Sequence, residues 1–378
     1  MPIQKQRLLF IVNEDWAFVS HFIERAVAAK EHGYDVAVVA HCTNHRRIIE
    51  SAGLTVFEHG MSRSGTNPFR EIASVLNLIK VIRNYRPTLI HLIALKPIVL
   101  GSCASIFYRK ARIICAPIGM GYLFSSDDSR ARRLRPIVNG ALRIALKRSR
   151  VAIIIENQDD MDTLKQGNFV KNNQIHLIKG AGVNLNTYRA TSETDDHLVV
   201  SLFARMLRDK GIVEFVQAAT AIKQSRPDIQ FRLIGGLDDG NPAALSSQQM
   251  EDWVAEGSVT WLGQRSDVPE LLAKSNIVVL PSYREGLPKV LIEAAAAQRA
   301  VIATDVVGCR EAVTDGLNGL LIEPRNSHAL TDAIMRLVTD HDLRHKLAQA
   351  GRFRAENEFS SEIINTQTLA VYQQVLNR

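Results

Sequence analysis

The sequence predicts an α/β protein of two Rossmann-like domains that face each other across a cleft. Three observations lead to this prediction. Short apolar runs alternate with helix-forming stretches along the chain. The apolar runs lack polar alternation, which is typical of parallel strands covered by helices on both faces. A polar and acidic stretch, residues 183–196, divides the series, and 378 residues suffice for two domains of ordinary size.

The predicted elements follow this alternation along the chain. We expect strands at 8–12, 35–40, 88–94, 112–116, 151–156, 175–178, 198–203, 231–234, 259–262, 277–280, 300–304 and 319–322. Helical patterns between them include 18–32, 67–84, 212–224 and 328–355. The predicted domains are an N-terminal domain over 1–182, a linker over 183–196, a C-terminal domain over 197–358 and a final helix over 359–378.

The composition is that of an ordinary globular protein. Hydrophobic residues make up 46% and charged residues 22% of the chain. No apolar run approaches the ~18 residues of a membrane-spanning helix, and the first strand begins too early for a secretory signal peptide to precede it. Cys42, Cys103, Cys115 and Cys309 lack metal-ligand spacing and lie in apolar stretches. We therefore expect reduced core cysteines in a cytoplasmic protein.

The net charge of +7 is concentrated in one segment. Residues 130–150 hold eight Arg or Lys and no acid, so the rest of the chain is close to neutral. Leu134, Ile137 and Leu142 belong to an apolar stripe at helical spacing, and a basic amphipathic helix is typical of membrane-surface binding. The alternative is a domain helix that buries the stripe and leaves its charges in water. Nucleic acid is not favoured, because residues 125–150 contain no aromatic side chain for base stacking.

A strand, a loop and a helix start follow one another over residues 277–297. The loop contains Gly286 and Pro288, and the Ala/Leu-rich stretch after it predicts a helix with Pro288 in its first turn. Ligands of parallel sheets bind at the carboxyl ends of strands, where helix N-termini attract phosphate. Glu285 and Glu293 cannot be phosphate ligands there. Their carboxylates suit the hydroxyl groups of a sugar and of a ribose.

The stretch Pro-Ser-x-x-Glu-Gly-x-Pro-x-x-x-x-Glu-Ala, residues 281–294, resembles the Glu-x7-Glu signature of GT-B glycosyltransferases of family 4. The pattern Ala-Thr-Asp-x-x-Gly-x-x-Glu-x-x-x-Asp-Gly-x-x-Gly-Leu-Leu over 303–321 is similar to that family as well. The resemblance implies a GT-B fold whose last helix returns to the first domain. It also implies a retaining, metal-independent enzyme. Glu293 would hold the ribose hydroxyls and Glu285 the ring hydroxyls of a nucleotide sugar, beside Gly286, Leu287 and Pro288.

A basic loop follows the strand at 198–203. Arg205 and Lys210 resemble the pair with which the family neutralises the donor diphosphate. Two fixed cations can stabilise the charge of a departing nucleoside diphosphate without a metal. The alternative is an exposed basic loop. Gly235 ends the next strand, and its missing side chain would let the backbone approach the donor.

The acceptor side departs from the family pattern. The loop after the first strand lacks the family's Gly-Gly pair and resembles a subgroup that builds bacterial surface polysaccharides on lipid carriers. His21 in that region, His91 on a strand and Lys96 just beyond it are candidate acceptor contacts. Their alternatives are a capping or solvated histidine, a satisfied core histidine and a plain surface lysine. Many relatives carry a second histidine where this chain has Ile93.

We therefore predict a retaining transferase of hexosyl or N-acetylhexosaminyl groups. It would move a sugar from a nucleotide sugar, with uridine as the expected base, to a polyprenyl-diphosphate-linked saccharide of O-antigen, capsule or exopolysaccharide. No cofactor is expected, since the Asp pairs 160/162 and 340/342 fit helical surface better than metal binding. The enzyme would lie on the inner face of the cytoplasmic membrane, with anionic lipid bound by Arg130, Arg132, Arg133 and Arg135. The alternatives are a non-catalytic glycan-binding subunit and a nucleotide-sugar epimerase. The sequence leaves open the sugar, the linkage, the acceptor and the oligomeric state.

Overall fold

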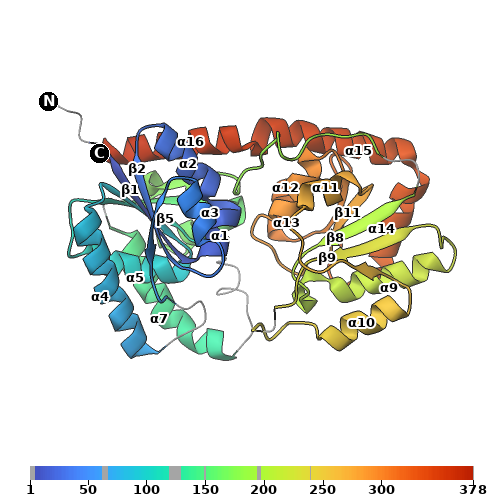
Figure 1. Cartoon of the computed structure of the whole chain (residues 1–378), viewed down its shortest axis with the longest axis horizontal. Helices are drawn as coiled ribbons and strands as arrows, with labels where there is room; N and C mark the ends of the chain where they lie inside the picture. The colour runs from blue at the N-terminus through green and yellow to red at the C-terminus, as the bar shows by residue number, and fades with distance from the viewer. Residues whose placement is uncertain are drawn as a thin grey trace. The chain divides into compact units, whose positions relative to one another are not determined.

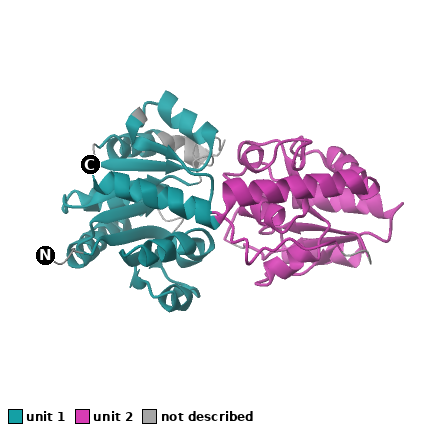
Figure 2. Ribbon diagram, turned by 90° about the horizontal axis from the view of Figure 1, so that it is seen from above, with its two compact units in different colours: residues 1–181, 361–378 teal, residues 182–360 magenta. Residues whose placement is uncertain are grey.

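The computed structural model describes residues 5–61, 67–118, 129–148, 150–193, 197–238 and 240–377, without the side chains of 68, 129–135, 137 and 172. The chain divides into two compact units, coloured separately in Figure 2. Unit 1 comprises Met1–Ala181 with Ser361–Arg378, and unit 2 comprises Gly182–Ser360. Each unit is an α/β domain with its own parallel sheet, as the sequence predicts.

Unit 1 contains a seven-stranded sheet in the order β3-β2-β1-β4-β5-β6-β7. Figure 1 labels β1, β2 and β5 of this sheet. Its strands are β1 (Arg7–Glu14), β2 (Asp35–His41), β3 (Thr55–Glu58), β4 (Leu89–Ile93), β5 (Arg112–Ala116), β6 (Val151–Ile155) and β7 (Ile175–Leu177). Its helices are α1 (Asp15–His21), α2 (Ile23–Glu31), α3 (Arg46–Ser51), α4 (Pro68–Tyr85), α5 (Leu95–Ser105), α7 (Ser129–Leu146), α8 (Gln158–Gln166), the 3₁₀ turn η1 (Asn172–Gln174) and α16 (Ser361–Leu376).

Central strand β1 is apolar on both faces because the sheet is covered on both sides. Leu9 and Ile11 pack into one hydrophobic cluster with α4, α5 and α7. Leu8 and Phe10 point the other way, into a cluster with α1, α2 and α16. All four side chains are fully buried. The continuous apolar run that predicts this strand therefore reflects two cores, one on each face.

Unit 2 contains a six-stranded sheet in the order β10-β9-β8-β11-β12-β13. Its strands are β8 (Val199–Phe203), β9 (Gln230–Ile234), β10 (Thr260–Trp261), β11 (Ile277–Leu280), β12 (Ala300–Thr304) and β13 (Leu320–Ile322). Its helices are the 3₁₀ turn η2 (Arg208–Lys210), α9 (Ile212–Lys223), α10 (Ser247–Ala255), α11 (Val268–Ala273), α12 (Lys289–Ala296), α13 (Val307–Ala312), α14 (Ser327–Thr339), α15 (His341–Arg354) and the π-helical turn η3 (Ala355–Phe359).

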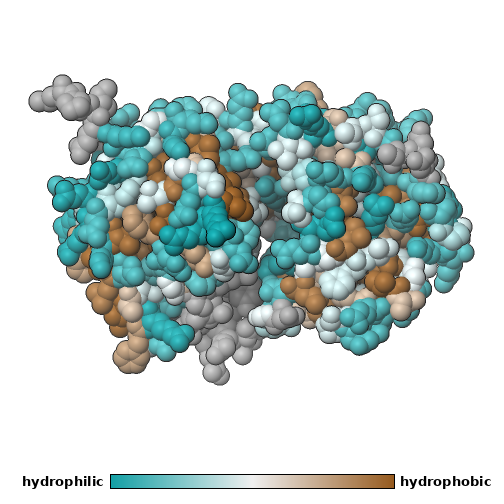
Figure 3. Space-filling model, viewed as in Figure 1, coloured by the Kyte–Doolittle hydropathy of each residue, from teal (hydrophilic) through white to brown (hydrophobic). Residues whose placement is uncertain are grey.

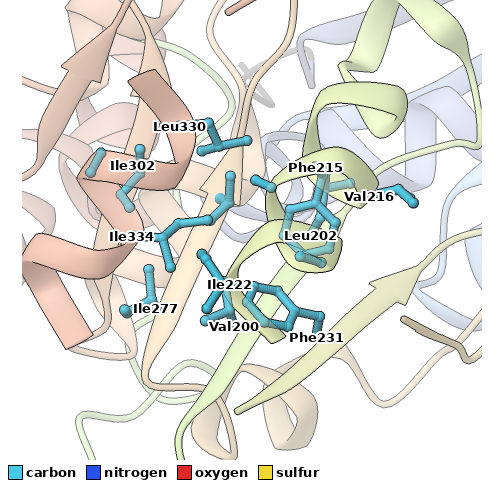
Figure 4. Close-up of a cluster of buried hydrophobic side chains, with 14 of the residues drawn as sticks. Val200, Leu202, Phe215, Val216, Ile222, Phe231, Ile277, Ile302, Leu330 and Ile334 are labelled. Atoms are coloured by element: carbon cyan, nitrogen blue, oxygen red, sulfur yellow. The ribbon is translucent and has the colours of Figure 1, made fainter. Parts of the chain in front are cut away.

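The strand order of unit 2 reverses between β8 and β11. Chain order runs outward from β8 through β9 to β10 in one direction, and from β11 through β12 to β13 in the other. One face of these strands packs on α9 and α14, where Phe215, Phe231, Ile277 and Ile334 interlock (Figure 4). At such a reversal, the loops beyond the carboxyl ends of two neighbouring strands diverge and leave room for a ligand.

Three local predictions differ from the structure. The sequence analysis does not predict strand β3, whose residues 55–58 contain only two apolar side chains between Thr55 and Glu58. The helical patterns at 18–32 and 328–355 each form two helices, which separate at Phe22 and at Asp340. The side chain of Asp340 caps α15 by accepting from the Leu343 N–H, a role that favours a helix start over a helix interior. Cys103 is exposed, so its prediction as a core residue is wrong.

The segment expected to be a linker packs on unit 2. Its described part, 183–193, begins with a bridge from Val183 to Ser360. Further on, Glu193 accepts hydrogen bonds from the Arg344 guanidinium at 2.9–3.1 Å. Arg299 donates to the hydroxyl of Thr191 at 2.6 Å. Polar composition alone predicts a solvated linker, but here the polar side chains are the partners of arginines in unit 2.

The C-terminal helix α16 belongs to unit 1, as the resemblance implies. It packs against α2 and places Tyr372 in the core. The Tyr372 hydroxyl and Nδ1 of His91 are 2.7 Å apart and both side chains are fully buried. Burial, with a contribution from the Arg25 charge, lowers the pKa of His91 to about 3. Because the ordinary value is 6.5, this histidine contributes stability that is fully present above pH 6.5 and is lost as the pH falls toward 3.

Replacing Tyr372→Phe should destabilise the protein because it removes the hydrogen-bond partner of a buried imidazole. We expect a loss of about 1–3 kcal/mol in the free energy of unfolding, the range for a buried polar group left without a partner. Urea unfolding followed by circular dichroism measures it. Tyr34→Phe, which removes a hydroxyl from the neighbouring ring, is the control. Equal stability of wild type and Tyr372→Phe would show that the bond to His91 contributes nothing.

Candidate active site

Two loops of unit 2 meet at the β8–β11 reversal through an ion pair. Glu285 lies in the loop between β11 and α12, and Lys210 ends the η2 turn after β8. The Lys210 Nζ is 2.6 Å from Glu285 Oε1, and both side chains are largely shielded from solvent. The structure therefore brings together two of the residues that the sequence predicts for the donor site.

Close backbone packing holds these two loops against each other. Gly211 follows Lys210 with φ +70°, and a Cβ added there would lie 2.2 Å from the carbonyl oxygen of Pro281. Only glycine fits this approach and this backbone conformation. The Tyr283 N–H also donates to the Asp209 carbonyl oxygen at 2.9 Å. The position of Lys210 relative to Glu285 is thus fixed by the backbone as well as by charge.

Tyr283 adds a side-chain connection to helix α9. Its hydroxyl donates to Glu214 Oε1 at 2.6 Å, and the Arg325 guanidinium lies 4.7 Å from its ring centroid. Burial first, and then the bond to the Glu214 carboxylate, raise the pKa of Tyr283 to about 12. The phenol therefore stays protonated at neutral pH and remains a donor. It anchors the Glu285 loop to the first turn of α9.

Glu293 lies in the second turn of α12, and its Oε1 has two partners. The Tyr188 hydroxyl donates to Oε1 at 2.8 Å, and the Lys289 ammonium is 3.3 Å from the same atom, one turn earlier. The residue is 7% exposed. Pro288 directly precedes this helix. The sequence predicts it in the first turn, one position further on. A buried carboxylate held in this way has a fixed direction, and a carboxylate oxygen can accept from a ligand hydroxyl.

Gly308 brings helix α13 against the same loop. A Cβ built on Gly308 would lie 1.8 Å from the Gly286 carbonyl oxygen, so no side chain fits between them. Gly286 is exposed, Leu287 is half-buried against the core of unit 2, and Pro288 is buried. The N-terminus of α13 therefore supports the loop from the side of β12.

Arg205 and Gly235 lie on the β9 side of the reversal. The Arg205 guanidinium forms a close ion pair with Asp238, which follows β9. Gly235 directly follows β9, and its N–H donates to the Gly263 carbonyl oxygen at 2.8 Å. Arg205 is thus held by an acid that the sequence reasoning did not single out. Its role toward a donor phosphate stays a prediction.

The acceptor-side candidates all lie in unit 1. His21 ends helix α1 and is half-buried. Lys96 lies in the first turn of α5, and its ammonium is 2.7 Å from Glu71 Oε1. His91 lies in the middle of β4, opposite Phe10, where it has the core environment of the alternative interpretation. The structure does not bring these three side chains into one described cluster.

The predicted membrane segment forms a helix, α7. The side chains of Arg130, Arg132, Arg133 and Arg135 lie outside the described residues. Among the described part of the chain, Leu142 and Ala145 are buried in the unit 1 core. Burial of this part of the stripe is what the alternative interpretation predicts. Membrane binding by the charges of this segment stays a prediction.

The described residues contain no group of three or more His, Cys, Asp or Glu side chains placed to hold a metal ion. In the first predicted pair, the Asp160 N–H donates the cap bond of α8 to the Asn157 side-chain oxygen, and the Asp160 carboxylate accepts from the Asn157 amide. Asp162 accepts from Gln158. In the second, Asp340 caps α15. No helix among the described residues is long and apolar enough to span a membrane.

Comparison with known proteins identifies the family. Residues 7–157 match a family model described as glycosyl transferase 4-like, and residues 186–354 match one described as glycosyl transferases group 1. The two models cover most of the N-terminal and C-terminal halves. The chain belongs to the GT-B glycosyltransferases of family 4, the family that the Glu-x7-Glu motif indicated.

A relative from Campylobacter jejuni aligns over nearly the whole chain. It is N,N'-diacetylbacillosaminyl-diphospho-undecaprenol alpha-1,3-N-acetylgalactosaminyltransferase, 29% identical over 374 residues that cover 95% of this chain and 96% of that one. Sucrose-phosphate synthase from Thermosynechococcus elongatus has a similar structure, with TM-score 0.81, 21% identity and coverage of 99% and 100%. Anabaena HepE in complex with UDP and glucose has TM-score 0.79, 21% identity and coverage of 98% and 100%. These two likenesses show the fold.

Sequence reasoning missed the residues that position the site. Tyr188 lies in the stretch interpreted as a linker, and Asp238 and Glu214 belong to other loops and helices. None of them follows a motif in the sequence, since each is defined by a contact with a residue far along the chain. Tyr283 stands inside the recognised motif, but its spacing gives no sign of a bond to α9.

Gly308→Ala should displace the Glu285 loop, because the added methyl would overlap the Gly286 carbonyl. We expect a loss of roughly 1–3 kcal/mol in the free energy of unfolding, the range for overpacking. Urea unfolding of the variant measures it. The control is Gly240→Ala, where a Cβ meets no atom within 4 Å. If the two variants have the same stability, the contact between Gly308 and the loop is not as tight as described.

Proposed function

We propose that the protein is a retaining glycosyltransferase that moves a sugar from a UDP-linked donor to a polyprenyl-diphosphate-linked saccharide. The product would belong to a bacterial surface polysaccharide: an O-antigen, a capsule or an exopolysaccharide. The observation that carries the proposal is the Lys210–Glu285 ion pair at the β8–β11 reversal, with the buried Glu293 on the helix that follows the Glu285 loop. The name of the Campylobacter relative, which acts on a diphospho-undecaprenol-linked sugar, supports the acceptor. The UDP complex of the Anabaena structure supports the nucleotide.

The side chains of this site divide the donor between them. Glu293 accepts from the ribose hydroxyls, and Glu285 accepts from a ring hydroxyl of the sugar. Lys210 and Arg205 face the diphosphate. Gly286, Leu287, Pro288 and Gly235 form the wall along which the backbone approaches the donor.

Positively charged side chains stabilise the leaving group. As the bond between the sugar C1 and the phosphate oxygen breaks, negative charge builds up on the departing diphosphate. Lys210 is already oriented by Glu285, so little reorganisation is needed when the charge develops. The acceptor oxygen bonds to C1 on the face that the phosphate leaves, and the phosphate takes the acceptor proton. On this route no metal and no protein base is required.

Sugar transfer to a lipid-linked acceptor tests the proposal. Purified protein is incubated with UDP-sugars and a polyprenyl-diphosphate-linked saccharide, in buffer containing EDTA. We expect an α-linked product from an α-linked donor, identified by mass spectrometry and NMR. Lys210→Ala and Arg205→Ala should each lower turnover by roughly 10²–10³, as when one electrostatic donor to a transition state is lost. Arg226→Ala, on the far side of α9 in an exposed ion pair with Asp228, is the control.

Three outcomes would contradict the proposal. Binding of UDP-sugar with no transfer to any acceptor would indicate a binding subunit. An isomerised nucleotide sugar formed without acceptor would indicate an epimerase. Loss of transfer in EDTA, restored by manganese, would show that a metal neutralises the leaving group.

Substitutions of the two glutamates should affect nucleotide binding differently. Glu293→Ala removes the ribose acceptor, so we expect weaker binding of both UDP and UDP-sugar. Glu285→Ala should leave UDP binding close to wild type and weaken use of the intact sugar donor. Isothermal titration calorimetry with UDP, together with KM for the donor, measures both effects. Equal loss of UDP affinity in the two variants would show that the roles are wrongly assigned.

A further inference from the structure

Helix α4 exposes an apolar stripe that its own domain does not cover. Phe69 is 81% exposed, Ile72 59% and Leu76 62%, while Leu78 and Ile82 on the opposite side are fully buried. The N-terminus of the helix is capped, because the Asn67 side chain accepts from the Phe69 N–H at 3.0 Å. Figure 3 shows brown and tan surface at the lower left, where Figure 1 places α4. The stripe therefore belongs to a well-formed helix.

Cations continue the same stripe toward the C-terminal end of the helix. At 100° per residue, Phe69, Ile72 and Leu76 fall within an arc of about 60°. An arc of about 80° contains these three residues together with Lys80 and Arg83. Lys80 and Arg83 are both exposed. The exposed face of α4 is thus apolar over its first turns and basic over its last turns. This is the pattern of a helix that lies in the interface of a bilayer.

The part of the sequence that contains the stripe carries mostly positive charge. Between residues 67 and 150 the chain has sixteen Lys or Arg and three acids, a net charge of +13. No acid occurs from 72 to 126, and Glu71 is paired with Lys96. The rest of the chain is therefore acidic, since the whole carries +7. A positive field over an apolar stripe is complementary to an anionic surface with an apolar interior.

The neighbouring helices extend the same layer. Helix α5 packs against both α4 and α7, and the three cover one face of the unit 1 sheet. In the described part of α7, Ile144 is exposed between Arg143 and Lys147. The layer thus presents apolar and basic side chains together on more than one helix.

We propose that the exposed stripe of α4 (Phe69, Ile72 and Leu76) inserts into the headgroup region of an anionic lipid bilayer, with Lys80 and Arg83 on the phosphates. This inference rests on the proposed function, whose acceptor is held in a membrane. It assigns the docking contact to a helix that the sequence analysis predicts but does not consider for membrane binding. Cations near an anionic surface attract it, and buried apolar side chains add an attraction that salt does not screen.

A second copy of the chain fits the stripe less well. A two-fold contact through α4 would bring the same region of both copies together, so that two regions of +13 net charge would meet. Like charges directly opposed are unfavourable. The lipid surface offers the opposite charge.

Vesicle sedimentation tests the proposal with the full-length protein. The variant Phe69→Ser/Ile72→Ser/Leu76→Ser is compared with wild type on vesicles of phosphatidylcholine and phosphatidylglycerol, and of phosphatidylcholine alone. We expect the partition coefficient of the variant on anionic vesicles to fall at least about tenfold. The matched control is Leu317→Ser/Phe353→Ser, which removes two exposed apolar side chains from unit 2 and should bind like wild type.

Salt separates insertion from charge attraction. At 1 M salt the Debye length falls to ~3 Å, so the variant should dissociate while wild type keeps part of its binding. Reversing Arg130, Arg132, Arg133 and Arg135 to Glu should lower the salt-sensitive part and leave the part that resists salt. As a second readout, Phe69→Trp should gain a blue-shifted emission on vesicles, quenched by brominated lipid beyond the quenching of wild type.

The outcomes distinguish this inference from the proposed function. Unchanged vesicle binding of the triple serine variant, with circular dichroism of a folded protein, would overturn the inference. So would a wild-type dimer in light scattering that the variant converts to a monomer, because a second copy would then be the occupant. Transfer to an acceptor in detergent should be the same in wild type and variant. Absence of transfer in wild type would contradict the proposed function alone.

Discussion

The ion pair between Lys210 and Glu285 sets the geometry on which the candidate site depends. It joins the loops after β8 and β11, which are neighbours in the sheet although far apart in the sequence. Each charge is largely removed from water, and such a charge is tolerated when a partner of opposite sign is in contact. The backbone supports the pair, since Gly211 touches Pro281 without a side chain between them. A ligand that separates the two charges would have to replace both partners, as a sugar hydroxyl and a phosphate would in the proposed donor complex.

Buried charges need partners, and this need also explains why the polar stretch 183–193 packs on unit 2. Glu293 is almost fully buried, and its bond from Tyr188 is made by residues 105 positions apart. Glu193 and Arg344 form a second bond of this kind. Truncating one partner of such a pair leaves the other buried without compensation, which is costly. The segment 183–193 is therefore part of the domain that it introduces, and its polar composition reflects the charges it meets.

The sequence was enough to predict the fold class, most strands and the residues of the Glu-x7-Glu motif. Buried parallel strands are apolar on both faces, and that signal is local, so strands such as 277–280 and 300–304 were predicted to the residue. Contacts between distant residues have no local signal. The bond of His91 to Tyr372 spans 281 positions, and Asp238 and Tyr188 are recognisable only once the loops are in place. The α4 stripe was missed for the opposite reason: its helical period predicts the helix but not which face remains uncovered.

Hydrogen–deuterium exchange of the full-length protein with and without UDP tests the central claim most directly. If the β8–β11 reversal holds the nucleotide, peptides covering 203–211 and 281–293 should exchange more slowly with UDP. Peptides of α8 and α4, in the other unit, should change little through direct contact. The expected protection is lost when Glu293→Ala is used at the same UDP concentration. Protection confined to unit 1, at a concentration where calorimetry shows binding, would contradict the account.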